Sequence, residues 1–151
     1  MSETASTPAS GAADRVPQAL FVLRLALGLF LLQWAVEKFV RPEGASKIFG
    51  YYYGIDLSAS MPMIIGGLEI ILVLAFLAGA YKRITYGLVF LIHGISTVAT
   101  YHAILHPYQN SNHLFTAGIP VLAGFWVLYR LRERDTLYAF DSRNTGQPSE
   151  T

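Results

Sequence analysis

The stretch MIIGGLEIILVLAFLAG, from Met63 to Gly79, decides the fold of this chain. It suits hydrocarbon throughout, except that Glu69 places one carboxylate well inside the run. Of the 151 residues in the chain, 53% are hydrophobic and 14% are charged. Charged residues make up about 25% of an ordinary soluble domain. The composition therefore indicates a membrane protein rather than a soluble domain.

Four runs of the sequence are apolar enough to cross a bilayer core about 30 Å thick, which needs roughly 20 helical residues. We expect spans at about residues 17–39, 61–81, 84–101 and 113–129. The predicted fold is all-α: an integral membrane, antiparallel four-helix bundle. This single domain covers residues 16–135. A disordered N-terminal segment (1–15) precedes it, and a cytoplasmic tail (136–151) follows, ending in polar residues expected to be disordered.

The distribution of basic residues predicts the orientation of the bundle. Because the number of spans is even, both termini share a side with the turn between the second and third spans. That side carries seven basic residues: Arg15, Lys82, Arg83, Arg130, Arg132, Arg134 and Arg143. The other side carries three: Lys38, Arg41 and Lys47. We therefore predict a multi-pass protein of the cytoplasmic membrane with both termini in the cytoplasm.

The predicted spans carry stripes of polar and small residues, which helices need in order to pack closely inside a membrane. The stripe of the first span consists of Arg24, Gly28, Leu31, Ala35 and Lys38. The stripe of the third span consists of Tyr86, His93, Thr97 and Thr100. The long outer loop, residues 40–60, contains three consecutive tyrosines and is expected to lie along the outer membrane surface.

The depths of the ionisable residues predict one polar cluster inside the membrane. A rise of 1.5 Å per residue places Arg24 roughly 10 Å from the cytoplasmic side and Glu69 roughly 12 Å from the outer side. An extended arginine nearly closes the remaining difference in depth of about 8 Å in a core about 30 Å thick. His93 lies near the midplane. We predict a buried polar or ligand-binding cluster made of Arg24, Lys38, Glu69, Tyr86, His93 and Thr97.

Two interpretations of this cluster stay open. An isolated charge at the middle of a span costs about 2.5–3.5 kcal/mol on insertion scales, so charged residues there usually face the bundle interior and pair. A pair between Arg24 and Glu69 serves to fix the helix register. Alternatively, the cluster holds a ligand or a proton, because an ionisable residue inside the membrane is by default a candidate for function.

Several classes of site are not indicated by the sequence. The chain has no cysteine, which excludes thiol chemistry and iron–sulfur ligation within it. His102, His106 and His113 have ligand chemistry, but no carboxylate lies in their loop, and we predict histidines at a helix end rather than a metal site. No catalytic motif or basic stripe for nucleic acid is present. We therefore predict neither catalysis by this chain alone nor a nucleic-acid partner.

Two segments carry a resemblance to a known family: LRLALGLFLLQWAVEKF at 23–39 and IIGGLEIILVLAFLAGAYKR at 64–83. In order, they place an arginine, a glycine and a lysine along the first span, then small residues before a glutamate, and last a glycine and a basic residue at the turn. From Ala19 to Arg130 the chain resembles the DoxX family of small four-helix bacterial membrane proteins. Gln33-Trp34 stands where members often carry a His-Gly-like pair.

The resemblance implies a protein of the bacterial inner membrane that is linked to redox or sulfur metabolism, as the small subunit of a thiosulfate:quinone oxidoreductase is. It implies an accessory or quinone- or lipid-binding component of a membrane redox system. Its expected partners are membrane lipids, an oxidoreductase subunit and a second copy of the chain. The cofactor is left open, with a quinone as the candidate. Two alternatives stay open: a small proton-coupled transporter that titrates Glu69, and a structural or assembly protein.

Overall fold

The computed structural model of the chain describes residues 15–58, 60–110 and 112–144. The predicted disordered segment, apart from its last residue, and the end of the predicted tail lie outside these residues. Every regular element in the described part is helical, which confirms the all-α prediction. The elements are α2 (Val16–Val40), α3 (Pro42–Ile48), the π-helical turn η1 (Phe49–Tyr53), α4 (Met61–Leu77), α5 (Lys82–Ala99), α6 (Tyr101–Leu105), the 3₁₀ turn η2 (Asn112–Ala117), α7 (Gly118–Arg130) and α8 (Phe140–Asn144).

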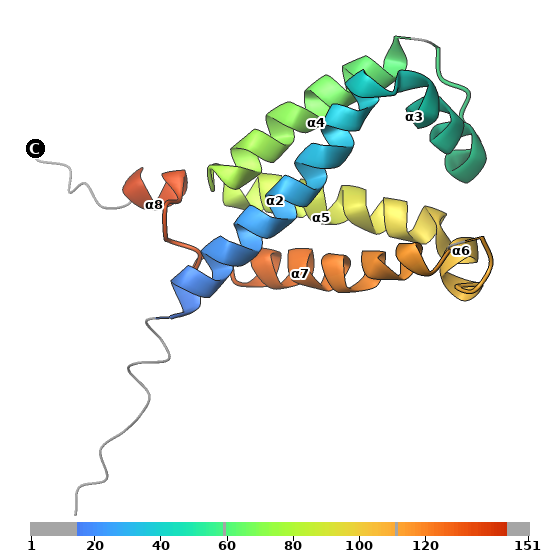
Figure 1. The fold of residues 1–151 in the computed structure, drawn as a ribbon. Helices are drawn as coiled ribbons and strands as arrows, with labels where there is room; N and C mark the ends of the chain where they lie inside the picture. Colours follow the sequence, from blue (N-terminus) through green and yellow to red (C-terminus); the bar gives the residue numbers. More distant parts are fainter. Residues whose placement is uncertain (1–14, 59, 111, 145–151) are drawn as a thin grey trace, which may run out of the picture.

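The four long helices form two antiparallel pairs, α2 beside α4 and α5 beside α7 (Figure 1). The pairs lie close together where α4 turns into α5, and they diverge toward α3 and α6. We call the first of these the closed end and the second the open end. The N-terminal end of α2 and the short helix α8 both lie at the closed end.

Local sequence signals explain where the helices begin and end. Prolines occupy the first turn of three helices, at Pro17, Pro42 and Pro62, where the missing N–H leaves no hydrogen bond unmade. Gly79 ends α4 with a φ of 62°, a left-handed conformation that favours glycine. A Cβ at Gly79 would also overlap the guanidinium of Arg24 and meet Ala139 Cβ at 2.8 Å. The turn therefore needs glycine both for its backbone and for space.

The apolar core fills the space between the two pairs. Its buried members come from all four long helices: Leu20, Leu27, Leu31, Val73, Phe76, Tyr86, Val89, Phe125 and Leu128. In α2, the predicted stripe faces this interior, since Arg24, Gly28, Leu31 and Ala35 are all buried. At Gly28 a Cβ would overlap the side chain of Leu77, so the missing side chain lets α2 and α4 approach closely.

The last predicted span differs from the structure at its start. Residues 112–117 form the 3₁₀ turn η2, and the α-helix α7 begins only at Gly118. The predicted second and third spans lie at α4 and α5, shifted at their ends by a few residues.

The fold also continues past the predicted boundary at residue 135. Asp135 and Ala139 are buried, and the Asp141 carboxylate accepts hydrogen bonds from the backbone N–H groups of Tyr81 and Lys82, each at 2.9 Å. Asp141 thereby satisfies N–H groups at the start of α5 that no helical carbonyl reaches. The first part of the predicted cytoplasmic tail is thus a structural segment that packs onto the closed end.

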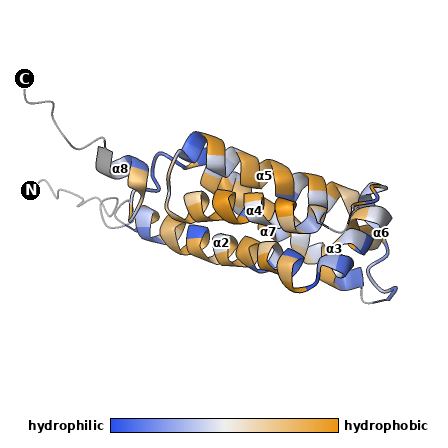
Figure 2. Ribbon diagram, turned by 90° about the horizontal axis from the view of Figure 1, so that it is seen from above, coloured by the Kyte–Doolittle hydropathy of each residue, from blue (hydrophilic) through white to orange (hydrophobic). Residues whose placement is uncertain are grey.

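Among the described residues, α2 is the one helix that is both long and apolar enough to cross a membrane. The helix α4 is also apolar but has 17 residues. Apolar residues predominate along the long helices, whereas hydrophilic residues concentrate toward the two ends of the bundle (Figure 2).

Candidate functional site

A cavity of about 730 Å³ lies at the open end, where the two helix pairs diverge. Its walls come from α2, α4, α5, the α3–η1 segment and η2, and they are mostly apolar. The aromatic members of the wall are Phe30, Trp34, Phe49, Tyr52, Tyr53 and Phe115. Small-molecule sites have volumes of about 300–1,000 Å³ and walls of this character. The cavity is therefore the candidate functional site.

The α3–η1 segment covers the cavity. The hydroxyl of Tyr53 donates a hydrogen bond to Ser96 Oγ on α5 at 3.1 Å. The ring of Tyr52 packs on Phe115 of η2 with 5.7 Å between centroids. Burial, and to a smaller extent the neighbouring Tyr51, raises the pKa of Tyr52, so its phenol stays neutral at physiological pH. The predicted surface loop is thus a folded cover that turns two of its three tyrosines inward.

An ion pair between α2 and α4 lines one side of the cavity. Lys38 Nζ lies 2.5 Å from Glu69 Oε2 and also donates to the backbone oxygen of Trp34 at 3.2 Å. Each side chain of the pair is 13% exposed. Gly66 makes this approach possible, because a Cβ there would lie 3.0 Å from both Ala35 O and Lys38 Cβ. Glu69 is therefore a paired carboxylate at the cavity wall.

His93, on α5, also lines the cavity. Its Nε2 lies 3.1 Å from the carbonyl oxygen of Gly118, which ties α5 to the start of α7. The rings of Phe30 and Phe125 pack against the imidazole at centroid distances of 5.8 and 5.4 Å. Thr97, one turn further along α5, donates its hydroxyl to the backbone oxygen of His93 at 2.8 Å. We call Lys38, Glu69 and His93 the cavity cluster.

A second polar group, which we call the Arg24 cluster, occupies the closed end. It consists of Arg24, Tyr86 and Asp135. Arg24 Nη1 lies 3.2 Å from Asp135 Oδ2 and donates to the Tyr86 hydroxyl at 3.2 Å. That hydroxyl donates to Asp135 Oδ2 at 2.6 Å. Arg24 Nη2 donates to the carbonyl oxygen of Leu137 at 2.7 Å. Arg24, Tyr86 and Asp135 are each 0% exposed, so the cluster is closed to solvent.

The predicted cluster that joins Arg24 to Glu69 and His93 is not found. Arg24 pairs with Asp135 at the closed end, whereas Glu69 pairs with Lys38 at the open end. The separation has a simple cause, because Lys38 lies 14 residues beyond Arg24 on the same helix, about 21 Å along its axis. At the level of Glu69, the stripe of α2 carries Lys38, which pairs with Glu69 in place of Arg24.

Four of the six predicted cluster residues line the cavity: Lys38, Glu69, His93 and Thr97. The other two, Arg24 and Tyr86, belong to the closed end. Three residues that make important contacts were not predicted: Tyr53, Ser96 and Asp135. A signal existed for Ser96, since it lies three residues after His93 and therefore on the same helix face. No comparable periodic signal marked Asp135, which follows the last helix among arginines.

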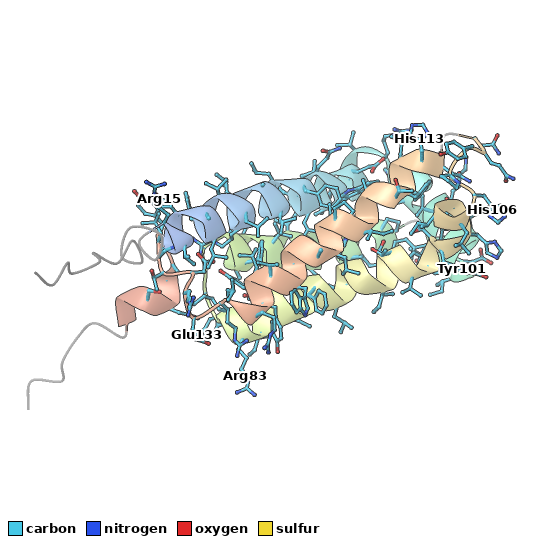
Figure 3. The ribbon with its side chains drawn as sticks, turned by 90° about the horizontal axis from the view of Figure 1, so that it is seen from below. Arg15, Arg83, Tyr101, His106, His113 and Glu133 are labelled. Atoms are coloured by element: carbon cyan, nitrogen blue, oxygen red, sulfur yellow. The ribbon has the colours of Figure 1, made fainter. Side chains whose placement is uncertain are left out.

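The three histidines of the loop, His102, His106 and His113, do not come together as one group. Within the part of the chain that the structure describes, no three His, Cys, Asp or Glu side chains come together to hold a metal ion. His106 Nδ1 donates to the backbone oxygen of His102 at 3.0 Å. Figure 3 shows His106 and His113 at the open end of the bundle, apart from one another.

Comparison of the chain with protein-family models, with curated proteins and with solved structures found no match. The function proposed below is therefore argued from the geometry of the cavity and of the bundle surface, together with the sequence resemblance.

Proposed function

We propose that the chain is a DoxX-like integral membrane protein of the bacterial inner membrane. In this proposal α2, α4, α5 and the η2–α7 segment span the bilayer. The cavity at the open end binds a quinone-type or lipid-like apolar ligand, and the protein serves as an accessory component of a membrane redox system. The cavity carries the proposal, because it combines an apolar aromatic wall with a few polar groups.

Helix dimensions support the membrane placement. At 1.5 Å per residue, α2 is about 37 Å long, and α4 and α5 are each about 26 Å long. The hydrocarbon core of a bilayer is about 30 Å thick. α7 alone is shorter, but with η2 before it the segment runs from Asn112 to Arg130 and approaches the same thickness.

The outward surface of the bundle supports the same placement. Large apolar side chains face outward on each long helix, among them Val22, Leu68, Ile71, Val98, Ile119 and Trp126. Monomeric soluble proteins rarely expose contiguous apolar patches of more than a few hundred Å². Lipid tails solvate such faces without penalty, whereas water does not.

The charged ends support the proposed orientation. Arg15, Arg83 and Glu133 lie at the closed end, whereas Tyr101, His106 and His113 lie at the open end (Figure 3). The predicted excess of basic residues thus belongs to the closed end, which the positive-inside rule assigns to the cytoplasm. The cavity then lies in the outer half of the membrane.

Labelling of single cysteines tests the orientation directly, because the chain contains no cysteine of its own. Tyr108→Cys marks the open end and Glu133→Cys marks the closed end, and both positions are exposed. In intact spheroplasts, a membrane-impermeant maleimide should label Tyr108→Cys, and it should label Glu133→Cys only after permeabilisation. Labelling of both before permeabilisation would contradict the proposal.

The edge of the cavity favours a ligand that arrives from the lipid phase. Several of its lining residues also reach the outer surface, and each is apolar: Trp34, Leu68, Ile92 and Leu114, all more than 40% exposed. The charges of Lys38 and Glu69 in its wall neutralise each other, and Glu37, the other carboxylate among the lining residues, lies 3.9 Å from the guanidinium of Arg41. Both features fit an uncharged molecule that is dissolved in the membrane.

Tryptophan fluorescence tests the cavity, because one of the two tryptophans lines it and the other lies outside it. In purified protein carrying Trp126→Phe, decylubiquinone should quench Trp34 with saturation. In the matched variant Trp34→Phe, Trp126 should show no saturable quenching. Ser96→Phe fills part of the cavity and should weaken the quenching of Trp34. Equal, unsaturable quenching of both tryptophans would sink the ligand-binding proposal.

A further inference from the structure

The pair His93 and Ser96 on α5 gives the cavity a specific hydrogen-bonding pattern. Both residues line the cavity, and they lie three positions apart on one helix face, where side chains are about 5–6 Å apart. Their polar atoms are therefore close enough for one ligand group to contact both.

His93 offers an acceptor to the cavity. A carbonyl oxygen only accepts hydrogen bonds, so the contact with Gly118 O assigns the ring proton to Nε2. The neighbours of the ring are the aromatic side chains of Phe30 and Phe125, and the Glu69 carboxylate is already paired with Lys38. An imidazolium would therefore be an unpaired charge in apolar surroundings, which is unfavourable. In the neutral ring Nδ1 is an acceptor, and within the described residues it has no hydrogen-bond partner.

Ser96 offers a donor to the same cavity. Its Oγ accepts the proton of Tyr53, which leaves its own hydroxyl proton available. The neighbouring hydroxyls are already used, because Thr97 donates to His93 O and Thr100 donates to Ser96 O. The lysine ammonium of the cavity cluster donates to Glu69 and Trp34. On α5, the acceptor His93 Nδ1 and the hydroxyl proton of Ser96 therefore remain side by side.

We infer that the cavity selects a ligand hydroxyl, which donates to His93 Nδ1 and accepts from Ser96 Oγ. A ketone oxygen satisfies only Ser96, because it has no proton to donate. This inference rests on the proposed ligand-binding function and sharpens it: the ligand is the reduced, hydroxyl-bearing member of the quinone class. A quinol and a hydroxyl-bearing lipid such as a diacylglycerol share this chemistry. The aromatic wall around His93 favours the flat ring of a quinol.

Competition binding distinguishes these ligands in the Trp126→Phe background. Titration with decylubiquinone under anaerobic conditions first gives its own affinity from the quenching of Trp34. Decylubiquinol or 1,2-dioctanoylglycerol is then added at a fixed low concentration of decylubiquinone, and its affinity follows from the competition. We expect the quinol to bind roughly tenfold more tightly than the quinone, since the two differ by the hydroxyl protons and one well-placed hydrogen bond is worth about that factor. Dioctanoylglycerol should compete more weakly than the quinol.

Two substitutions at His93 connect the preference to Nδ1. His93→Gln places an amide near the position of Nε2, which keeps the bond to Gly118 O and removes the acceptor. It should bind quinone as before but lose the preference for quinol. His93→Asn places a side-chain oxygen near the position of Nδ1 and should recover part of the preference. Retained quenching by quinone in His93→Gln shows that the cavity is intact.

The possible failures separate the two proposals. If neither decylubiquinone, decylubiquinol nor dioctanoylglycerol binds, the ligand-binding function itself is wrong. If quinone and quinol bind equally to the unmodified cavity, or if the preference survives in His93→Gln, the selection of a hydroxyl by His93 is wrong. If dioctanoylglycerol competes more tightly than the quinol, the assignment to the quinol class is wrong.

Discussion

The Arg24 cluster and the cavity cluster answer the same problem, an ionisable side chain inside an apolar bundle, in different ways. At the closed end, Arg24 is enclosed by the phenol of Tyr86 on α5 and by a carboxylate and backbone carbonyls from the segment after the last long helix. At the open end, Lys38 and Glu69 pair directly between neighbouring helices and remain partly exposed. In the first arrangement, the two terminal nitrogens of Arg24, the Tyr86 hydroxyl and Asp135 Oδ2 all make contacts that hold the chain together. The second leaves hydrogen-bonding groups facing a cavity.

The comparison indicates that the two ends have different roles. Replacing one member of a fully buried pair leaves an uncompensated charge, which destabilises strongly. A partly exposed pair at a cavity tolerates more change, because water or a ligand can replace a lost partner. Substitutions at the closed end should therefore affect stability, whereas those at the open end should affect binding more than stability.

The largest effect is expected from Arg24→Met. The change leaves the Asp135 carboxylate buried beside Tyr86 without its cation, and it should lower the free energy of unfolding by about 3–5 kcal/mol. Unfolding in mixed micelles of dodecyl maltoside and SDS measures this. Arg83→Met is the matched control at the same end, because Arg83 is exposed. The double variant Arg24→Met with Asp135→Leu should recover part of the loss.

A smaller effect at the same end is expected from Tyr86→Phe. The phenol both accepts from Arg24 and donates to Asp135, so its removal takes two hydrogen bonds from the buried ion pair. Unfolding should become easier by about 2 kcal/mol. Tyr129→Phe serves as the control, since Tyr129 stacks on Phe90 and its hydroxyl makes no hydrogen bond within the described residues. Equal losses of stability in Tyr86→Phe and Tyr129→Phe would contradict a stabilising role of the Tyr86 hydroxyl in the Arg24 cluster.

At the open end, Gly66→Ala tests the close contact between α2 and α4. The added methyl group meets Phe39 Cε2 at 2.9 Å and Ala35 O at 3.0 Å, so the helices must separate slightly. We expect a loss of about 1.5 kcal/mol in stability, because overpacking costs energy. Quinone quenching of Trp34 should weaken as well. Gly67→Ala is the adjacent control, since its nearest neighbour is Phe39 Cζ at 3.9 Å, and neither measurement should change.

The smallest effect on stability is expected from Glu69→Gln. The amide oxygen still accepts from Lys38, and the loss should be about 1 kcal/mol. Glu37→Gln is the control, because Glu37 lies outside the pair and only approaches Arg41 at 3.9 Å. If Glu69→Gln lowered the stability as much as Arg24→Met, the proposed difference between the two ends would be wrong. In reconstituted vesicles, a pH-dependent flux abolished by Glu69→Gln would favour the transporter alternative over ligand binding.

Much of the helical arrangement follows from the sequence, because it depends on local patterns. The four apolar runs correspond to the four long helices, and the stripe from Arg24 to Ala35 does face the core. Period and length determine such features, and both can be read along the chain. The ion pair of Glu69 was predicted with Arg24 and is formed with Lys38 instead. Lys38 ends the same stripe, lies at the level of Glu69 and is the nearer cation.

The remainder depends on contacts between distant segments. Asp135 lies 111 positions beyond Arg24, in a polar stretch that resembles a solvated tail, and the chain after it is held on the bundle by hydrogen bonds to the turn at Gly79. The cover over the cavity was missed for a related reason. Tyr53 and Ser96 meet across 43 positions, and consecutive tyrosines are as typical of a membrane interface as of a folded cover.

The position of the two clusters on α2 has a consequence for how the protein can change over evolutionary time. About 21 Å of helix separates Arg24 from Lys38, and substitutions farther apart than about 7–10 Å usually act additively when they share no partner. Residues around the cavity can therefore be exchanged, and new ligands acquired, without weakening the interactions of the Arg24 cluster that keep the chain folded. A bundle divided in this way is a scaffold on which selection can alter specificity one residue at a time.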